Sequence, residues 1–249
     1  MIVLLPPSEG KHSPARGRPL DLDALLAPSE LTATRTAVLD ALATVSAGAD
    51  AAYRLGVPPT LDREIARNTR LLSAPTAPAG QVYTGVLYAA LDLASLDTAA
   101  RRRAARRLVV VSALFGALRI GDRVPAYRLA MGVDLPGIGP LAAAWREPLG
   151  AVLPGLAGRG VVVDCRSAPY AAAWTPRAGL AERWVQIRVP GASHGAKHTR
   201  GLAARELCRS AVDPRRPEDL AAALGERFAV RLHEPARSGR PWILDCQVD

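Results

Sequence analysis

Residues 108–131, LVVVSALFGALRIGDRVPAYRLAM, decide the fold class. The run 108–111 is apolar without alternation, which is typical of a strand buried on both faces of a sheet. Glycines and charged residues follow at once, and such a loop after a buried strand is where α/β proteins place their sites. The stretch therefore predicts an α/β fold with a functional loop, although a solvated connection fits the same pattern.

Three other short apolar runs have the same character as this strand. They cover residues 2–5, 161–164 and 184–189, and each ends in a polar loop. We expect all four runs in one sheet, because such runs are typical of buried strands. Residues 228–233 and 242–246 predict a closing hairpin.

Helical spacing of apolar residues predicts helices over residues 29–47, 62–72 and 86–93. A further short helix is expected just before the central strand, over residues 101–107. The fold class expected is therefore mixed α/β (α+β), with a central, mainly buried sheet flanked by helices.

Composition excludes several classes of protein. The chain has 249 residues, a formal net charge of +9 and only 4% aromatic residues, which argues against a stacking platform for single-stranded nucleic acid. Cys165, Cys208 and Cys246 fit no zinc motif, and their small odd number is typical of reduced thiols. No segment has the length of a signal or membrane-spanning sequence. We expect a cytoplasmic protein with no metal, no cofactor and no membrane partner.

The two lysines are the strongest internal sign of chemistry. Nearly all the positive charge is arginine, and Lys11 and Lys197 are the only lysines. Arginine cannot replace lysine where a compact or deprotonatable amine is needed, so their survival indicates a functional role. Each precedes a histidine, and His194 lies close to the second pair. The alternative is that both are ordinary surface lysines.

Polar side chains follow each predicted strand, and we expect them to converge on one strongly basic cleft suited to phosphate or another anion. The catalytic candidates are Lys11, Asp122, Tyr127, Tyr170 and Lys197. The binding candidates are Ser8, Thr84, Ser112, Arg119, Arg128, Asp164, Arg166, Ser167, His194, His198 and Arg200. A desolvated lysine can act as nucleophile or base, with a tyrosine as the acid. Residues 191–201 predict an anion-binding loop that enters a helix at about Thr199.

Five segments in order resemble the YaaA peroxide-stress family. They are LLPPSEGK at 4–11, VYTGVLY at 82–88, SALFGALRIGDRVPAYRLAMG at 112–132, VVVDCRSAPY at 161–170 and GAKHTRG at 195–201. The resemblance implies a single domain over residues 1–249, with a compact α/β fold that is not a simple doubly wound sheet and that carries a helix-hairpin-helix element. It also implies protection against peroxide, limits on free iron, and binding of double-stranded DNA through a basic cleft.

Two segments bear on DNA binding. Residues 135–145 resemble the hairpin of a helix-hairpin-helix motif, where glycine N–H groups meet a phosphate. Pro125 and Gly132 argue against the helix that must precede such a hairpin, and they favour an ordinary turn that caps the next helix. Five arginines lie on the predicted helix at 101–107. They fit a surface that binds the phosphate backbone of DNA, and they fit an ordinary solvent-exposed helix face equally.

Two function classes stay open at this point, and with them whether the protein is an enzyme. The resemblance favours a DNA-binding peroxide-stress protein. The mixture of Asp, Tyr, Ser and His among the candidates favours an enzyme that acts on an anionic, nucleotide-like small molecule, because sequence-independent DNA binding needs only Arg and Lys.

Overall fold

The computed structural model describes residues 1–191 and 195–248. The strands are β1 (Ile2–Leu5), β2 (Ala77–Pro78), β3 (Leu108–Ser112), β4 (Gly116–Arg119), β5 (Arg123–Val124), β6 (Asp134–Leu135), β7 (Gly139–Pro140), β8 (Val162–Asp164), β9 (Trp184–Arg188), β10 (Ala229–His233) and β11 (Trp242–Gln247). The α-helices are α1 (Pro28–Ser46), α2 (Ala51–Arg54), α3 (Asp62–Arg67), α4 (Ala79–Val82), α5 (Val86–Leu91), α6 (Thr98–Arg107), α7 (Leu141–Ala144), α8 (Arg146–Ala157), α9 (Ala168–Ala171), α10 (Gly195–Arg209) and α11 (Pro217–Gly225). The 3-10 turns are η1 (Pro59–Leu61), η2 (Asn68–Arg70), η3 (Leu93–Ser95) and η4 (Ala178–Arg183).

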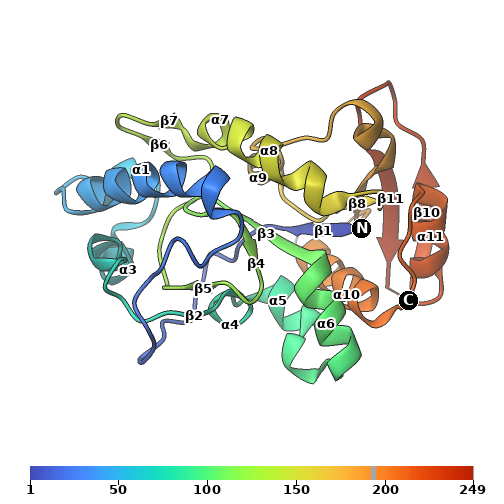
Figure 1. Ribbon diagram of the computed structural model, residues 1–249, viewed down its shortest axis with the longest axis horizontal. Helices are drawn as coiled ribbons and strands as arrows, with labels where there is room; N and C mark the ends of the chain where they lie inside the picture. Colours follow the sequence, from blue (N-terminus) through green and yellow to red (C-terminus); the bar gives the residue numbers. More distant parts are fainter. Residues whose placement is uncertain (192–194, 249) are drawn as a thin grey trace.

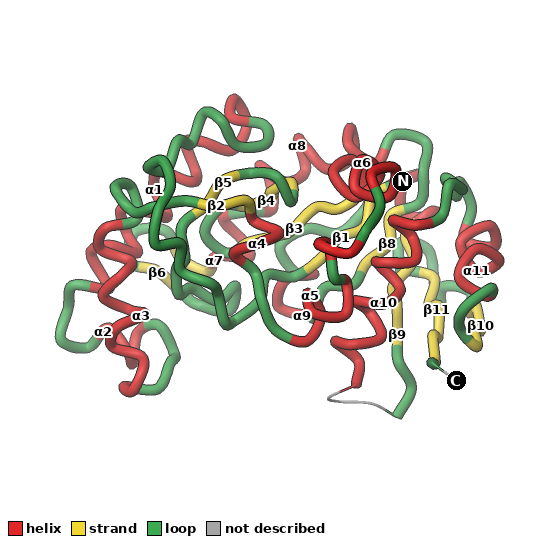
Figure 2. Tube along the Cα trace, turned by 90° about the horizontal axis from the view of Figure 1, so that it is seen from below, coloured by secondary structure: helices red, strands yellow, loops and turns green. Residues whose placement is uncertain are grey.

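The core is a sheet to which the described residues contribute seven strands in the order β10-β11-β9-β8-β1-β3-β4 (Figure 2). Neighbouring strands from β11 to β3 are parallel, and the edge strands β4 and β10 are antiparallel to their neighbours. The four apolar runs predicted as strands thus lie in one sheet, and the predicted closing hairpin forms β10 and β11. The expected mixed α/β fold is confirmed.

Continuous burial explains the residue choice in the three central strands. Every residue of β1, β3 and β8 is buried. Val3 of β1 pairs with Leu108 of β3 on one side and with Val163 of β8 on the other. Strands covered by helices on both faces need apolar side chains in both directions, which is why these runs do not alternate.

Helices cover both faces of the sheet (Figure 1). In that view α7 and α8 lie above it, and α5, α6 and α10 lie below it. Helix α6 begins at an N-cap, Asp97, whose carboxylate accepts a hydrogen bond from the backbone N–H of Ala100, and it leads directly into β3.

The parallel strands end at one edge of the sheet, and the chain leaves that edge in opposite directions. From β1 it continues to β3 on one side, whereas from β8 it continues to β9 on the other. Such a switch point between neighbouring strands opens a crevice at their carboxyl ends, where α/β proteins bind ligands. The architecture therefore directs attention to the loops after β1, β3 and β8.

Two expectations about local structure are wrong. The hairpin of β6 and β7 is followed by helix α7, but extended chain and a turn over residues 125–133 precede it, so the helix-hairpin-helix interpretation fails. Helix α10 begins at Gly195, four residues before the predicted start at Thr199. The single-domain organisation stays a prediction. Within the described residues, no helix combines the length and apolarity needed to cross a bilayer.

Candidate functional site

The loop after β1 carries Lys11 and is fixed to the start of α5. Lys11 forms an isolated antiparallel bridge with Tyr83, and its loop is held there by side chains as well. The Ser8 hydroxyl oxygen accepts a hydrogen bond from the backbone N–H of Thr84 at 2.9 Å, and the Thr84 hydroxyl donates to the carbonyl of Gly10 at 3.0 Å. Ser8 is half-buried and Thr84 is exposed, so this pair lies at the rim of the site.

The amine of Lys11 is half-buried against aromatic rings. Its Nζ atom donates to the carbonyl of Ser8 at 2.7 Å and lies 4.3 Å from the centroid of the Tyr127 ring and 5.7 Å from that of Tyr83. Burial, with the nearby positive charge of Arg128 as a second cause, lowers the pKa of Lys11 to about 7, and Glu9 opposes this shift. The amine can therefore gain or lose a proton near neutral pH.

Tyrosines surround this amine. The chain has five tyrosines, and Tyr83, Tyr88, Tyr127 and Tyr170 interact electrostatically with one another at this edge. Burial is the main cause that raises the pKa of each of the four, that of Tyr170 to about 12. These hydroxyls therefore stay protonated and can donate hydrogen bonds.

A directed chain of hydroxyl groups ends beside Lys11. Ser112 Oγ accepts from the backbone N–H groups of Leu114 and Phe115 at 3.2 and 3.1 Å, which occupies its two lone pairs. Its own O–H must then donate to the Tyr127 hydroxyl, 2.7 Å away. Tyr127 in turn donates to the Tyr83 hydroxyl at 3.0 Å. The proton of Tyr83 is left as the terminal donor of the chain.

Arg128 supplies the positive charge of the site. Asn68 holds its backbone, since the Asn68 side chain accepts from the Arg128 N–H and donates to the Arg128 carbonyl, each at 2.9 Å. The guanidinium donates to the carbonyl of Glu9 at 3.3 Å and lies 3.8 Å from the Glu9 carboxylate, which is largely exposed. Asn68 thus fixes the backbone of Arg128, while the guanidinium group faces the loop after β1.

Asp164 and Arg166 form a buried pair that satisfies itself. Both Asp164 oxygens bind the Arg166 guanidinium, at 2.9 and 2.7 Å, and the Trp184 indole N–H also donates to Asp164. Arg166 then donates to the carbonyls of Tyr170 and Trp174. Both partners are almost fully buried. Arg166 thus fixes the backbone of Tyr170, and the expected part of this pair in substrate binding stays a prediction.

Arg119 and Asp122 lie at the wrong edge for this site. Strand β4 turns back antiparallel to β3, so that Arg119 pairs with Val109 near the start of β3. The Asp122 carboxylate accepts from the backbone N–H groups of Leu26 and Arg119, which makes it a turn-forming group. The expectation that the polar side chains after all four predicted strands converge on one cleft is therefore wrong for Arg119 and Asp122.

The start of α10 reaches the same edge as Lys11. Gly201 packs against Leu87, and Arg205 donates to the carbonyl of Leu91, so α10 and α5 run side by side in the same direction. One turn before Gly201, Lys197 therefore lies beside the start of α5. Lys197 is exposed and so lacks the desolvation of a reactive lysine, and its role in a site shared with Lys11 stays a prediction.

The other candidates near α9 and α10 differ in placement. Ser167 and His198 are exposed, and Ser167 precedes α9 as its N-cap residue. Arg200 donates to the carbonyl of Ile187 at 3.1 Å, which ties the first turns of α10 to β9. His194 lies outside the described residues.

Sequence reasoning missed Glu9, Asn68, Tyr83 and Tyr88 as site residues. The residue pattern places Tyr83 and Tyr88 only in a segment that begins a helix. The signal that could have found them is the scarcity of tyrosine in this chain. Four of its five tyrosines lie at this site, as does one of its two lysines. Asn68 had no signal, since it acts on backbone groups brought close only by the fold.

No metal centre is evident in the part of the chain that the structure describes, where no three His, Cys, Asp or Glu residues are grouped to hold an ion. Cys165, Cys208 and Cys246 are free and buried. Burial raises the pKa of each thiol to about 12, so none is a ready thiolate.

Fold and site together define an α/β protein with a lysine- and tyrosine-lined site at the switch point of its parallel strands. A family model described as "Peroxide stress protein YaaA" matches residues 1–233, so the chain belongs to the YaaA peroxide-stress family. It is 50% identical to a UPF0246 protein of Streptomyces coelicolor, over 100% of this chain and 98% of the relative. It is 36% identical to a UPF0246 protein of Corynebacterium efficiens, over 94% and 96% of the two chains, and 34% identical to one of Corynebacterium glutamicum, over 88% and 90%.

Proposed function

We propose that this protein is an enzyme that acts on a small, nucleotide-like anion at the carboxyl ends of β1, β3 and β8. The observation that carries the proposal is the pairing of a half-buried lysine amine with two buried tyrosine rings at the switch point. An ordinary surface lysine does not need such a setting, whereas a reactive amine does.

Each group has a role in this proposal. Lys11 acts as nucleophile or general base in its neutral form, which its lowered pKa makes available near neutral pH. Tyr83, as the last donor of the hydroxyl chain, donates a hydrogen bond to the reacting oxygen of the substrate. Arg128 binds the anionic group of the substrate, because its guanidinium is fixed at the backbone and weakly paired at the head.

The family to which the chain belongs is described by peroxide stress. We propose that the reaction supports peroxide tolerance, and that it takes place in the cytoplasm, where free buried thiols such as these three stay reduced.

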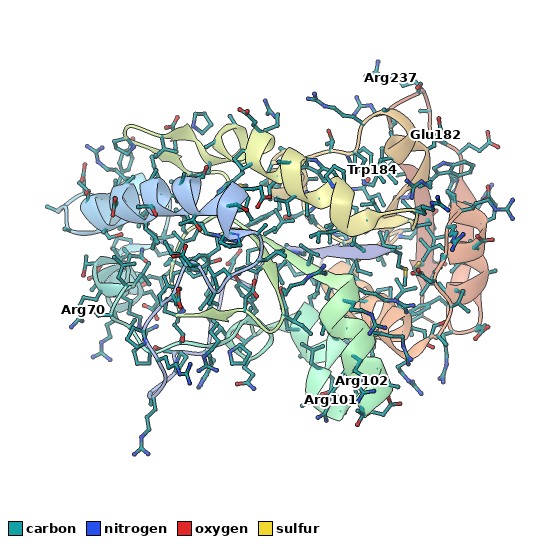
Figure 3. All side chains as sticks on the ribbon, in the orientation of Figure 1. Arg70, Arg101, Arg102, Glu182, Trp184 and Arg237 are labelled. Carbon is teal, nitrogen blue, oxygen red and sulfur yellow. The ribbon has the colours of Figure 1, made fainter. Side chains whose placement is uncertain are left out.

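Complementation tests the proposal. A bacterium that lacks its own relative and is peroxide-sensitive should be rescued by the wild-type chain, whereas Lys11→Arg should not rescue it. A matched control is Arg237→Lys, which exchanges the same two residue types at an exposed position far from the site (Figure 3). Thermal unfolding of the purified variants checks that both fold. Full rescue by Lys11→Arg would exclude a reactive amine, since arginine keeps the charge and loses the deprotonatable group.

Duplex DNA binding is the second candidate, favoured by three exposed arginines on α6, Arg101, Arg102 and Arg106. These guanidiniums could neutralise backbone phosphates without reading sequence. The affinity for a short duplex should then fall steeply as salt rises from about 50 to about 200 mM, and replacing each arginine with alanine should reduce the slope by about one. An affinity that does not change with salt would exclude this role.

A further inference from the structure

A second basic site lies at the opposite, amino-terminal edge of the sheet. An open cavity of about 860 Å³ is lined there by α6, the end of β4, α8 and the segment after α10. Five arginines line it, Arg102, Arg103, Arg106, Arg107 and Arg119, against one carboxylate. A cavity of this volume is in the size range of small-molecule sites, and its charge calls for an anion.

Three of these arginines are held in place by backbone carbonyls. Arg103 donates to the carbonyls of Cys208 and Arg209, both at 2.7 Å. Arg107 donates to those of Leu207, Ser210 and Val212. These contacts close the C-terminal end of α10, where carbonyl groups lack helical partners.

Arg119 is the third of these, and it donates to the carbonyl of Arg106. Its guanidinium group, which comes from β4, therefore lies beside the arginines of α6 that line the cavity. Positive charges of the cavity therefore come from two separate elements and are fixed before any ligand arrives. Such fixed donors reduce the ordering cost of binding.

Two arginines remain free to bind. Among the described residues, no hydrogen bond or ion pair engages the side chain of Arg102 or Arg106, and both residues are exposed. They lie four positions apart on α6, where like charges face each other and destabilise a helix. The carboxylate of Asp213 lies 3.9 Å from Arg107 and also pairs with the amino group of Met1, so it does not neutralise these two. A bound anion would relieve their repulsion.

We propose that this cavity binds a small oligophosphate, such as the di- or triphosphate group of a nucleotide. Guanidinium groups bind phosphate oxygens in bidentate pairs, and several of them around one cavity match a ligand with several linked negative charges better than a single phosphate. The cavity is walled by α8 on the side away from α6. A compact ligand therefore fits it better than the face of a duplex.

This site is independent of the reaction proposed at Lys11. The Lys11 site lies at the carboxyl ends of the parallel strands, whereas Arg119 and the start of β3 mark the other end of the same sheet. Loss of oligophosphate binding at the amino edge would leave the Lys11 site intact.

Titration calorimetry with inorganic tripolyphosphate and with ATP tests the proposal at physiological salt. We expect saturable binding of both to the wild-type chain, and at least about tenfold weaker binding to the double variant Arg102→Ala/Arg106→Ala, which loses two bidentate partners. The control is Arg70→Ala/Arg101→Ala, which removes the same charge at exposed positions (Figure 3). Arg101 lies on the same helix but lines a different cavity. We expect the control to bind within about twofold of the wild type.

Three results would overturn the proposal. The first is the absence of saturable binding to the wild type. The second is an equal loss in both double variants, which would indicate diffuse electrostatic attraction. The third is a short duplex that binds and displaces tripolyphosphate while both double variants lose the duplex equally, which would assign the surface to DNA. Circular dichroism establishes that the variants fold, and Arg102→Gln/Arg106→Gln, which keeps the helix propensity, must reproduce the loss.

Discussion

The Nζ atom of Lys11 lies 4.3 Å from the centroid of the Tyr127 ring. The ring face and the carbonyl of Ser8 favour the ammonium form of the amine. Burial and the charge of Arg128 favour the neutral form, and they dominate, since the pKa of Lys11 is lowered to about 7. The site thus holds an amine whose protonation state changes in the physiological range.

Lys11 should make the free energy of unfolding rise with pH between about 7 and 10.5. The pKa of its amine is about 7 in the folded protein and 10.5 without the burial. In this interval the unfolded chain binds more protons, so raising the pH stabilises the folded state. Below pH 7 the cost of burying the ammonium is fully present, and above pH 10.5 it is absent.

Urea unfolding of the wild type and of Lys11→Met at about pH 6 and about pH 9.5 measures this effect. The difference in unfolding free energy between the two proteins should move in favour of the wild type at the higher pH. Between the two pKa values of the amine it should change by about 1.4 kcal/mol for each step of one in pH. A difference that is the same at both pH values would contradict the lowered pKa.

Tyr127→Phe should destabilise the protein by about 1–3 kcal/mol, because it leaves two buried hydroxyls, those of Ser112 and Tyr83, without their partner. The free energy of unfolding in urea measures the loss. Tyr53→Phe is the control, since Tyr53 is 89% exposed and should tolerate the change. Equal effects of the two substitutions would argue that the hydroxyl chain does not form.

Gly201→Ala should also destabilise the protein, by about 1–3 kcal/mol, because the new methyl group would lie 2.2 Å from the carbonyl oxygen of Leu87 and would force α10 away from α5. The matched control is Gly150→Ala inside α8, where nothing lies within 4 Å and where alanine favours the helix. Thermal unfolding should show a lower midpoint for the first variant and an equal or higher midpoint for the second. The reverse order would mean that the two helices are not in contact.

The three cysteines should not react with a thiol reagent until the protein unfolds. Each is buried, and burial raises the pKa of each thiol to about 12. Labelling with an aromatic disulfide at neutral pH should therefore be slow in buffer and fast in denaturant. Fast labelling of the native protein would show that at least one thiol is accessible, and would contradict the burial of the three cysteines.

The strands could be predicted from the sequence because burial on both faces leaves a continuous run of Val, Ile and Leu. Residues 2–5 and 108–111 could be placed in one sheet for that reason. The position of Asp122 could not, because nothing in the residue pattern shows that β4 turns back beside β3. Asp122 therefore lies near the amino end of β3, whereas its place soon after a predicted strand puts it at the carboxyl end.

The site could be predicted in part. Lys11 stands out by its rarity, and Tyr127 by its place after a buried strand. Lys197 has the same rarity but is exposed in the first turn of α10, a helix that begins four residues before its predicted start. The sequence predicts Asp164 as a ligand-binding group, whereas the fold uses both its oxygens to hold Arg166.

The pKa of the Lys11 amine is the most direct test of the central claim. Reductive methylation with a ¹³C label marks the two lysines and the amino group of Met1, and the variants Lys11→Arg and Lys197→Arg assign the two lysine signals. Titration by NMR should give a pKa of about 7 for Lys11. A value near the 10.5 of an ordinary lysine would contradict the account, because the amine would then be a permanent cation rather than a reactive group.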